Sequence, residues 1–155
     1  MQPLRLVLAA AILVAIPLAA SAANTFVAPA TWTHVVIGTP GAARTVDVWK
    51  LNDSATSPLL NLVVDTTQVY ADALAAVRSY AQSAGIKMTT DKDRPCAGVT
   101  AHEFAIQLET GNNTIFTTYT IVPDAKGITR ITYSRSGDAR VNKDVQAAID
   151  AFCAP

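Results

Sequence analysis

The spacing of apolar and polar residues changes several times along the chain and divides it into segments. Residues 1–22 are almost continuously apolar, with 17 of the 22 hydrophobic. From residue 31 onward, stretches with the two-residue period of a strand are interrupted by stretches with the wider period of a helix. In chain order these segments predict the arrangement ββ-β-α-β-βββ-α.

Seven segments have the composition and alternation typical of strands. They are residues 31–38, 43–51, 59–65, 86–90, 99–109, 114–122 and 128–135. A Thr-Pro-Gly-Ala turn joins the first two as a hairpin, and short turns make the last three an antiparallel meander. The polar run that follows residue 90, DKDRPCAG, is expected to be a solvated loop.

Two segments have helical spacing. In residues 68–84, Thr66 or Thr67 is expected to cap the start, and Gly85 occupies the left-handed position after the end. The second helix is expected over residues 143–152. One apolar stripe on each helix supports this assignment: Val69, Tyr70, Ala73, Leu74, Val77, Tyr80 and Ala81 on the first, and Val145, Ala148, Ile149 and Phe152 on the second.

Together the segments predict an α+β fold, a mostly antiparallel sheet of about six or seven strands with two packed helices. Apolar residues fall on both faces of the early strands, so we expect one helix to cover each face. The expected division places Trp49, Leu51 and Val63 opposite Val48, Leu62 and Val64.

The first 22 residues have the organisation of a secretory signal peptide. Arg5 supplies the positive start, residues 6–16 form the apolar run, and Ala20-Ser21-Ala22 supplies the small residues of a cleavage site. We expect cleavage after Ala22 or Ala23. An uncleaved anchor is the alternative, but this run is shorter than the roughly 20 residues of a membrane span.

Composition excludes several classes of protein. The 155 residues carry 12 basic and 12 acidic side chains, so the chain has neither the strong basicity of a nucleic-acid binder nor the charge excess of a disordered chain. Without the signal peptide, 133 residues with 11 basic and 12 acidic groups remain, a net charge of −1. We expect residues 23–30 to be a short leader and 31–155 a single domain without a membrane span.

The two cysteines, Cys96 and Cys153, are expected to form a disulfide, because an exported chain meets an oxidising compartment. Their spacing does not match a redox C-x-x-C pair, and four Cys or His ligands for zinc are not available at suitable spacing.

Five stretches of the sequence together resemble one known superfamily. They are Pro29 with Trp32, the helix ADALAAVRSYAQSAG, the strand CAGVTAHEFAIQLE, the hairpin TYTIVPDAKGITRITYS and the C-terminal helix. This order resembles the PsbP-like (Mog/PsbP) α/β/α sandwich superfamily, which includes exported bacterial proteins, many of them lipoproteins. The lipobox cysteine of those lipoproteins is missing here. The resemblance implies binding or accessory proteins, although a fold alone does not transfer a function.

The histidines offer little catalytic signal. His102-Glu103 begins like a zinc-protease motif, but Ile106 stands where the second histidine belongs. His34 and His102 could bind a metal together only if their strands were neighbours, and we expect both to be solitary structural histidines. Nucleophile-elbow, P-loop and dinucleotide motifs are absent from the sequence.

The carboxylates and aromatic residues favour structural roles as well. Asp91 and Asp93 lie in the expected solvated loop and lack the further ligands of a calcium site. Glu103 and Glu109 share one strand, and this spacing gives no support for a glycosidase pair, whose carboxylates face each other across a cleft. We expect Trp32 and Trp49 to lie in the core rather than on a ligand surface. Asn52 and Asn112 fit the glycosylation pattern.

These observations predict an exported small soluble non-enzymatic binding or accessory protein of the cell envelope or extracellular space. We expect its partner to be a protein or a small apolar ligand and not a nucleic acid, and we assign no catalytic, cofactor or metal residues. The alternative is a small secreted hydrolase that uses His102 or His34 with nearby carboxylates.

Overall fold

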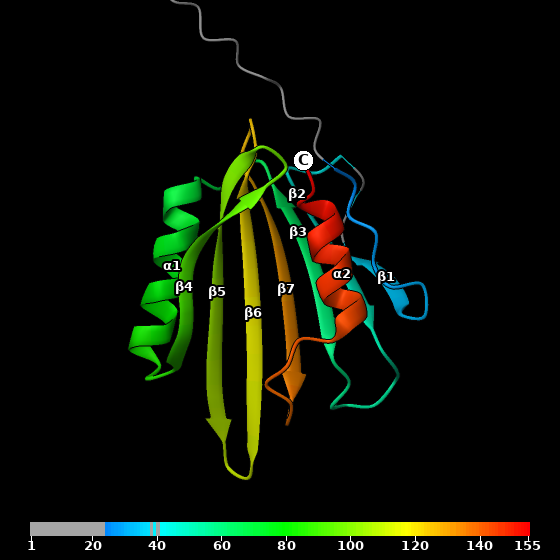
Figure 1. Cartoon of the computed structure of the whole chain (residues 1–155), viewed down its shortest axis with the longest axis vertical. Helices are drawn as coiled ribbons and strands as arrows, with labels where there is room; N and C mark the ends of the chain where they lie inside the picture. Colours follow the sequence, from blue (N-terminus) through cyan, green and yellow to red (C-terminus); the bar gives the residue numbers. More distant parts are fainter. Residues whose placement is uncertain (1–23, 38, 40) are drawn as a thin grey trace, which may run out of the picture.

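The computed structural model describes residues 24–37, 39 and 41–155, which form one antiparallel sheet and two helices (Figure 1). The predicted signal peptide and the cleavage position after Ala22 or Ala23 lie outside the described residues. The elements are β1 (Thr33–Ile37), β2 (Arg44–Lys50), β3 (Leu59–Asp65), α1 (Tyr70–Ser83), β4 (Lys87–Cys96), β5 (Val99–Thr110), β6 (Asn113–Pro123), β7 (Ile128–Ser136) and α2 (Lys143–Phe152). The predicted α+β fold and its element order are confirmed.

The strands lie in the order β1-β2-β3-β7-β6-β5-β4, and every neighbouring pair is antiparallel. Both the first hairpin and the final meander are therefore confirmed. The meander pairs back onto β3 through β7, which brings the middle and the end of the chain together. As a result, β1 and β4 form the two edges of the sheet.

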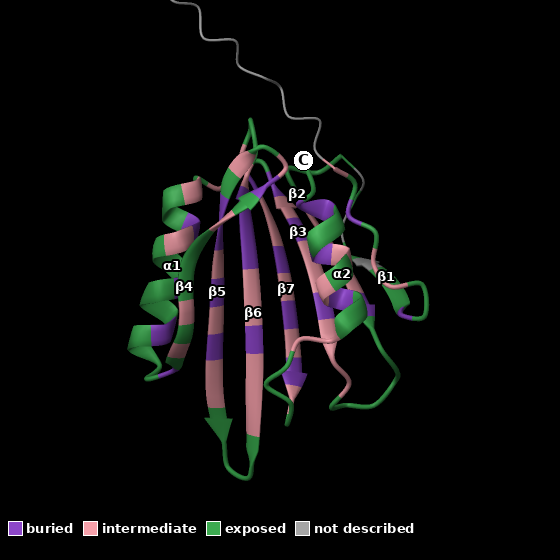
Figure 2. Cartoon of the chain, viewed as in Figure 1, coloured by how far each residue is buried: buried purple, intermediate pink, exposed green. Residues whose placement is uncertain are grey.

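Each helix covers a different face of the sheet. Helix α1 packs its buried Ala73 and Val77 against Phe104 of β5. Helix α2 packs on the other face, where Trp49 lies opposite Leu60 in the register of β2 and β3. Because of this register, Trp49 shares its face with Leu62 rather than with Val63, which corrects the predicted division. Figure 2 shows the buried positions running through the middle of the sheet and along the inner sides of the helices.

Strand β4 is twice as long as predicted. Residues 87–96 pair with β5 as one strand, with a register shift between Met88 and Thr90. The prediction of a solvated loop over DKDRPCAG is therefore wrong for its first six residues. Pairing places Asp91 opposite Phe104 and Asp93 opposite His102, so both carboxylates lie on the α1 face.

The start of α1 also differs from the prediction. Val69 is the N-cap residue and provides no side-chain hydrogen bond. Thr67 instead donates from its backbone nitrogen and its hydroxyl to the Asp65 carboxylate, at 2.9 and 2.7 Å. Thr67 is thus committed to the end of β3 and cannot cap the helix. At the other end, Gly85 has a φ of 62°, which confirms its left-handed position.

The predicted Cys96–Cys153 disulfide is confirmed and joins the end of β4 to the end of α2. The Ala97 nitrogen also donates to the Cys153 carbonyl at 3.0 Å. The expected leader contributes here too, since Phe26 is buried beside Phe152. Within the described residues, neither helix is long and apolar enough to cross a membrane.

Candidate functional site

His102 of β5 lies between two carboxylates of β4. Its Nδ1 is 2.7 Å from Asp93 Oδ1, and its Nε2 is 2.6 Å from Asp91 Oδ1. Each ring nitrogen therefore lies within hydrogen-bond distance of a carboxylate oxygen, which is an acceptor. The histidine is buried, whereas the two carboxylates reach the surface.

Arg78 of α1 completes this ion cluster. Its Nε and Nη2 donate to the two oxygens of Asp91 at 2.9 and 2.8 Å, the bidentate geometry that arginine favours with carboxylates. Hydrogen bonding from Arg78 is the main reason that the pKa of Asp91 falls from 3.8 to about 2. The guanidinium lies 5.2 Å from the centre of the Phe104 ring. The cluster therefore ties α1 to β4 and β5.

The geometry of this cluster does not support catalysis or metal binding. A general base needs a free ring nitrogen, and both nitrogens of His102 already face carboxylates. Those carboxylates lie on opposite sides of the ring and cannot chelate one ion with it. In the described part of the chain, no group of three His, Cys, Asp or Glu side chains could hold a metal.

His34 lies far from His102. Four strands separate β1 from β5 in the sheet, so the two histidines cannot share a metal. His34 Nε2 is 2.8 Å from Asp47 Oδ1, and its ring stacks on Trp49 with centroids 4.7 Å apart. This second histidine–carboxylate pair is exposed to solvent.

The remaining residues singled out from the sequence have structural surroundings. Glu103 lies within 3.5 Å of Arg94 and 3.8 Å of Lys92, and Glu109 accepts hydrogen bonds from Gln107 and Thr114. The core assignment of the two tryptophans is confirmed. Trp32 and Trp49 are both buried. The two asparagines that fit the glycosylation pattern, Asn52 and Asn112, are exposed.

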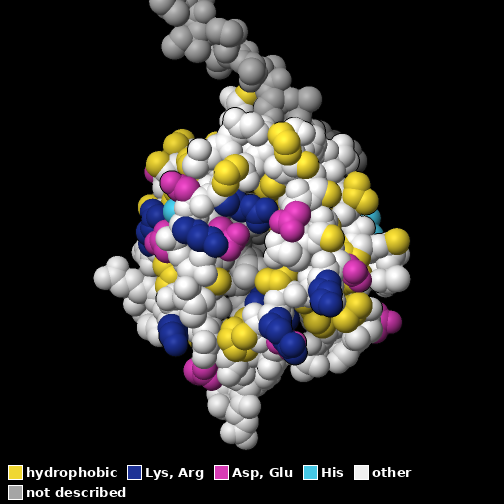
Figure 3. Space-filling view, in the orientation of Figure 1, with side chains coloured by type: hydrophobic (Ala, Val, Ile, Leu, Met, Phe, Trp, Pro, Cys, Tyr) yellow, Lys and Arg dark blue, Asp and Glu magenta, His cyan; other side chains and the backbone are white. Residues whose placement is uncertain are grey.

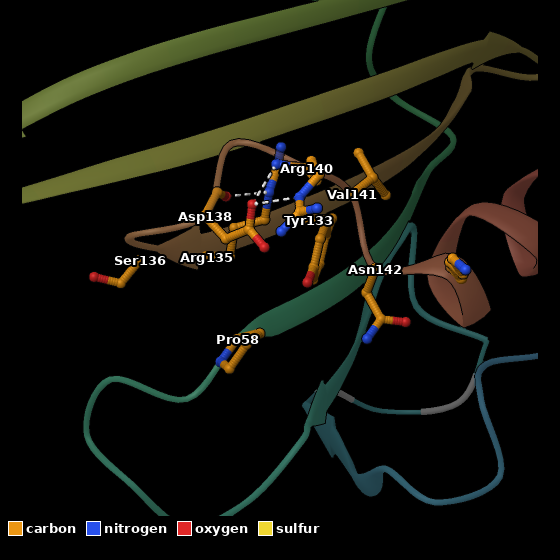
Figure 4. Close-up of a pocket in the computed structure, with 9 residues that line it drawn as sticks. Pro58, Tyr133, Arg135, Ser136, Asp138, Arg140, Val141 and Asn142 are labelled. Atoms are coloured by element: carbon orange, nitrogen blue, oxygen red, sulfur yellow. Dashed lines mark hydrogen bonds and ion pairs between the residues drawn. The ribbon is translucent and has the colours of Figure 1, made fainter.

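A cavity of about 340 Å³ lies on the α2 face, where the loop from β7 reaches the start of α2 (Figure 4). The strands contribute Tyr133 and Arg135 of β7, and Pro58 precedes β3. The loop contributes Asp138 and Arg140. Figure 3 shows this face of the molecule, with Lys, Arg, Asp and Glu side chains around a hollow near its centre.

Arg135 is the unusual residue of this cavity, because it is a buried cation, only 6% exposed. Its Nε donates to the backbone carbonyl of Asp138 at 3.1 Å, and its Nη2 donates to the carbonyl of Ala139. The guanidinium also lies 5.1 Å from the Tyr133 ring centre and 5.9 Å from that of Phe116. Among the described residues, Nη1 has no hydrogen-bond partner, and burial lowers the pKa of Arg135.

Two exposed cations stand beside Arg135. Arg140 contacts Asp138 at 3.3 Å, with its own side chain 89% exposed, and Lys143 opens the first turn of α2. Between them, Asn142 caps α2 by accepting from the backbone nitrogens of the next turn. Three basic side chains therefore stand at this cavity, together with apolar surface from Pro58, Tyr133 and Val141.

Reasoning from the sequence missed this cavity. One signal was present, because Arg135 follows Ile131 and Tyr133 at the two-residue spacing of one strand face. An arginine at an inward position of a strand is a buried charge that needs partners. The loop that supplies those partners has no periodic pattern of its own.

No family model and no curated protein matches the chain. The resemblance to the PsbP-like superfamily stays a prediction, and function has to be argued from the geometry.

Proposed function

We propose that the protein is an exported, non-enzymatic binding module that acts in the cell envelope or outside the cell. The signal-peptide pattern of residues 1–22 supports export, and the Cys96–Cys153 disulfide fits an oxidising compartment. A binding or accessory role also agrees with the proposed membership of the PsbP-like superfamily.

The observation that carries the binding role is the cavity between β7 and α2. Its volume of about 340 Å³ lies within the range of small-molecule sites, roughly 300–1,000 Å³. The cavity is lined by apolar side chains together with hydrogen-bonding and charged groups, but not by either histidine. The hydroxyl of Ser136, which could act as a nucleophile, donates instead to the side chain of Asn113. The lining is suited to holding a ligand rather than to transforming it.

A secreted hydrolase built on His102 is the second candidate. It is favoured by the contacts of 2.6 and 2.7 Å between His102 and two carboxylates. Against it, both ring nitrogens are engaged, and His102 does not line the cavity between β7 and α2. We therefore place the binding module first.

The test uses the full chain, produced with its leader in an exporting bacterial host. We expect mass spectrometry of the exported protein to find a start at Ala23 or Asn24. In two-dimensional NMR, a panel of small neutral and charged molecules should shift signals of residues 137–143. We expect no turnover of ester, phosphoester or peptide substrates. Turnover that disappears in a His34→Gln/His102→Gln variant would establish the hydrolase instead.

A further inference from the structure

Among the described residues, Arg135 forms no ion pair with a carboxylate in the cavity on the α2 face. A buried cation costs free energy unless an anion or a full set of hydrogen-bond acceptors compensates it. Arg135 has two backbone carbonyls, and within the described residues neither a carboxylate nor any acceptor contacts its Nη1. The charge is thus fixed beside the cavity and only partly compensated.

The rim of the cavity adds positive charge to that of Arg135. Arg140 and Lys143 are exposed, and their flexible side chains can move toward a ligand. The start of α2 adds the positive end of a helix dipole. Against these, Asp138 is the one carboxylate among the described lining residues, and its Oδ1 already accepts from the backbone nitrogen and Nε of Arg140.

We infer that this cavity binds a small molecule through a phosphate group or a comparable, multiply charged oxyanion. This inference rests on the proposed binding function and names the chemistry of its ligand. Arg140 supplies the forked donors that match phosphate oxygens, Lys143 supplies a point charge, and the buried Arg135 supplies a fixed charge beside them. Because the cavity is larger than one oxyanion, Tyr133 and Pro58 are placed to contact the organic part of the ligand.

The experiment compares matched probes by NMR titration of the full exported protein. Glucose 6-phosphate, glucose, inorganic phosphate and citrate are added separately, and the shifts of residues 137–143 are followed. We expect glucose 6-phosphate to bind at least about tenfold more tightly than glucose, since charge-assisted hydrogen bonds are the stronger class. Inorganic phosphate that binds as tightly as the sugar phosphate would identify the oxyanion alone as the ligand.

Substitutions test the named residues. Arg140→Gln/Lys143→Gln should weaken glucose 6-phosphate binding about tenfold. The control is Lys126→Gln, because Lys126 is also exposed but lies just before the start of β7, at the end of the strand away from the cavity. It should change the binding less than about twofold. Asp138→Asn should tighten binding. These surface changes are preferred to Arg135→Gln, which also removes the bonds that hold the loop.

Two outcomes overturn the inference, and they differ in what they imply. If glucose binds in the cavity as tightly as glucose 6-phosphate, the oxyanion inference fails while the binding module stands. If none of the probes, neutral or charged, shifts residues 137–143, the assignment of the cavity as a ligand site fails as well.

Discussion

Arg78 and Arg135 both lie against aromatic rings, one on each face of the sheet, but among the described residues only Arg78 of the two forms an ion pair with a carboxylate. Arg78 donates twice to the Asp91 carboxylate, whereas Arg135 donates to backbone carbonyls of a loop. Ions therefore help to hold α1 on its face. On the other face, α2 is held by apolar contacts, the disulfide and one ion pair, between Arg94 of β4 and Asp150 of α2 at 2.8 Å, whereas the buried Arg135 donates to backbone carbonyls.

The largest loss of stability is expected when the disulfide that attaches α2 is removed. In a Cys96→Ala/Cys153→Ala variant, the free energy of unfolding should fall by about 4 kcal/mol, since the disulfide closes a long loop in the unfolded chain. Urea unfolding of the exported protein measures this change. A reducing agent should destabilise the wild-type protein by a similar amount and leave the variant unaffected. A loss below about 1 kcal/mol would show that apolar packing and the Arg94–Asp150 ion pair retain α2 without the disulfide.

The attachment of α1 should be weaker and should depend on pH. Asp91→Asn removes the partner of Arg78 and one partner of His102, and should cost about 1–2 kcal/mol, because the site is partly screened by solvent. The pKa of Asp91 is about 2 in the folded protein and 3.8 ordinarily. Its stabilisation is therefore complete above about pH 4 and is lost as the pH falls through 2.

Urea unfolding of wild-type protein and Asp91→Asn from pH 7 to pH 2 measures this difference. The two unfolding free energies should converge at the acid end. A difference that stays constant over this range would show that the charge of Asp91 does not hold the helix.

Most of the fold could be predicted from the apolar pattern, because apolar and polar residues alternate along a strand that has one buried face. Strand β3 was predicted with its observed ends, and so was helix α2. Strand β4 was missed beyond residue 90 because it is an edge strand whose residues are polar on both faces. Its conformation is imposed by pairing with β5, which no local pattern can reveal.

The two histidines were recognised, but their surroundings were not. The contacts of His102 depend on the extension of β4, which aligns Asp91 and Asp93 with it. The basic cavity depends on a loop that folds over Arg135 without a periodic signal. In both places the missing information is a contact between segments whose own sequences look like ordinary polar loops.

The smallest effect is expected at Asp47, the partner of His34. This pair also joins a histidine and an aspartate, but it is exposed on the outermost hairpin and holds no helix. Asp47→Asn should change the free energy of unfolding by less than about 0.5 kcal/mol at pH 7, because the contact is exposed to solvent. Urea unfolding beside Asp91→Asn provides the comparison. If Asp47→Asn lowers the free energy of unfolding as much as Asp91→Asn does, the stabilising contact is the one between aspartate and histidine. The additional contact of Asp91 with Arg78 of α1 would then contribute little.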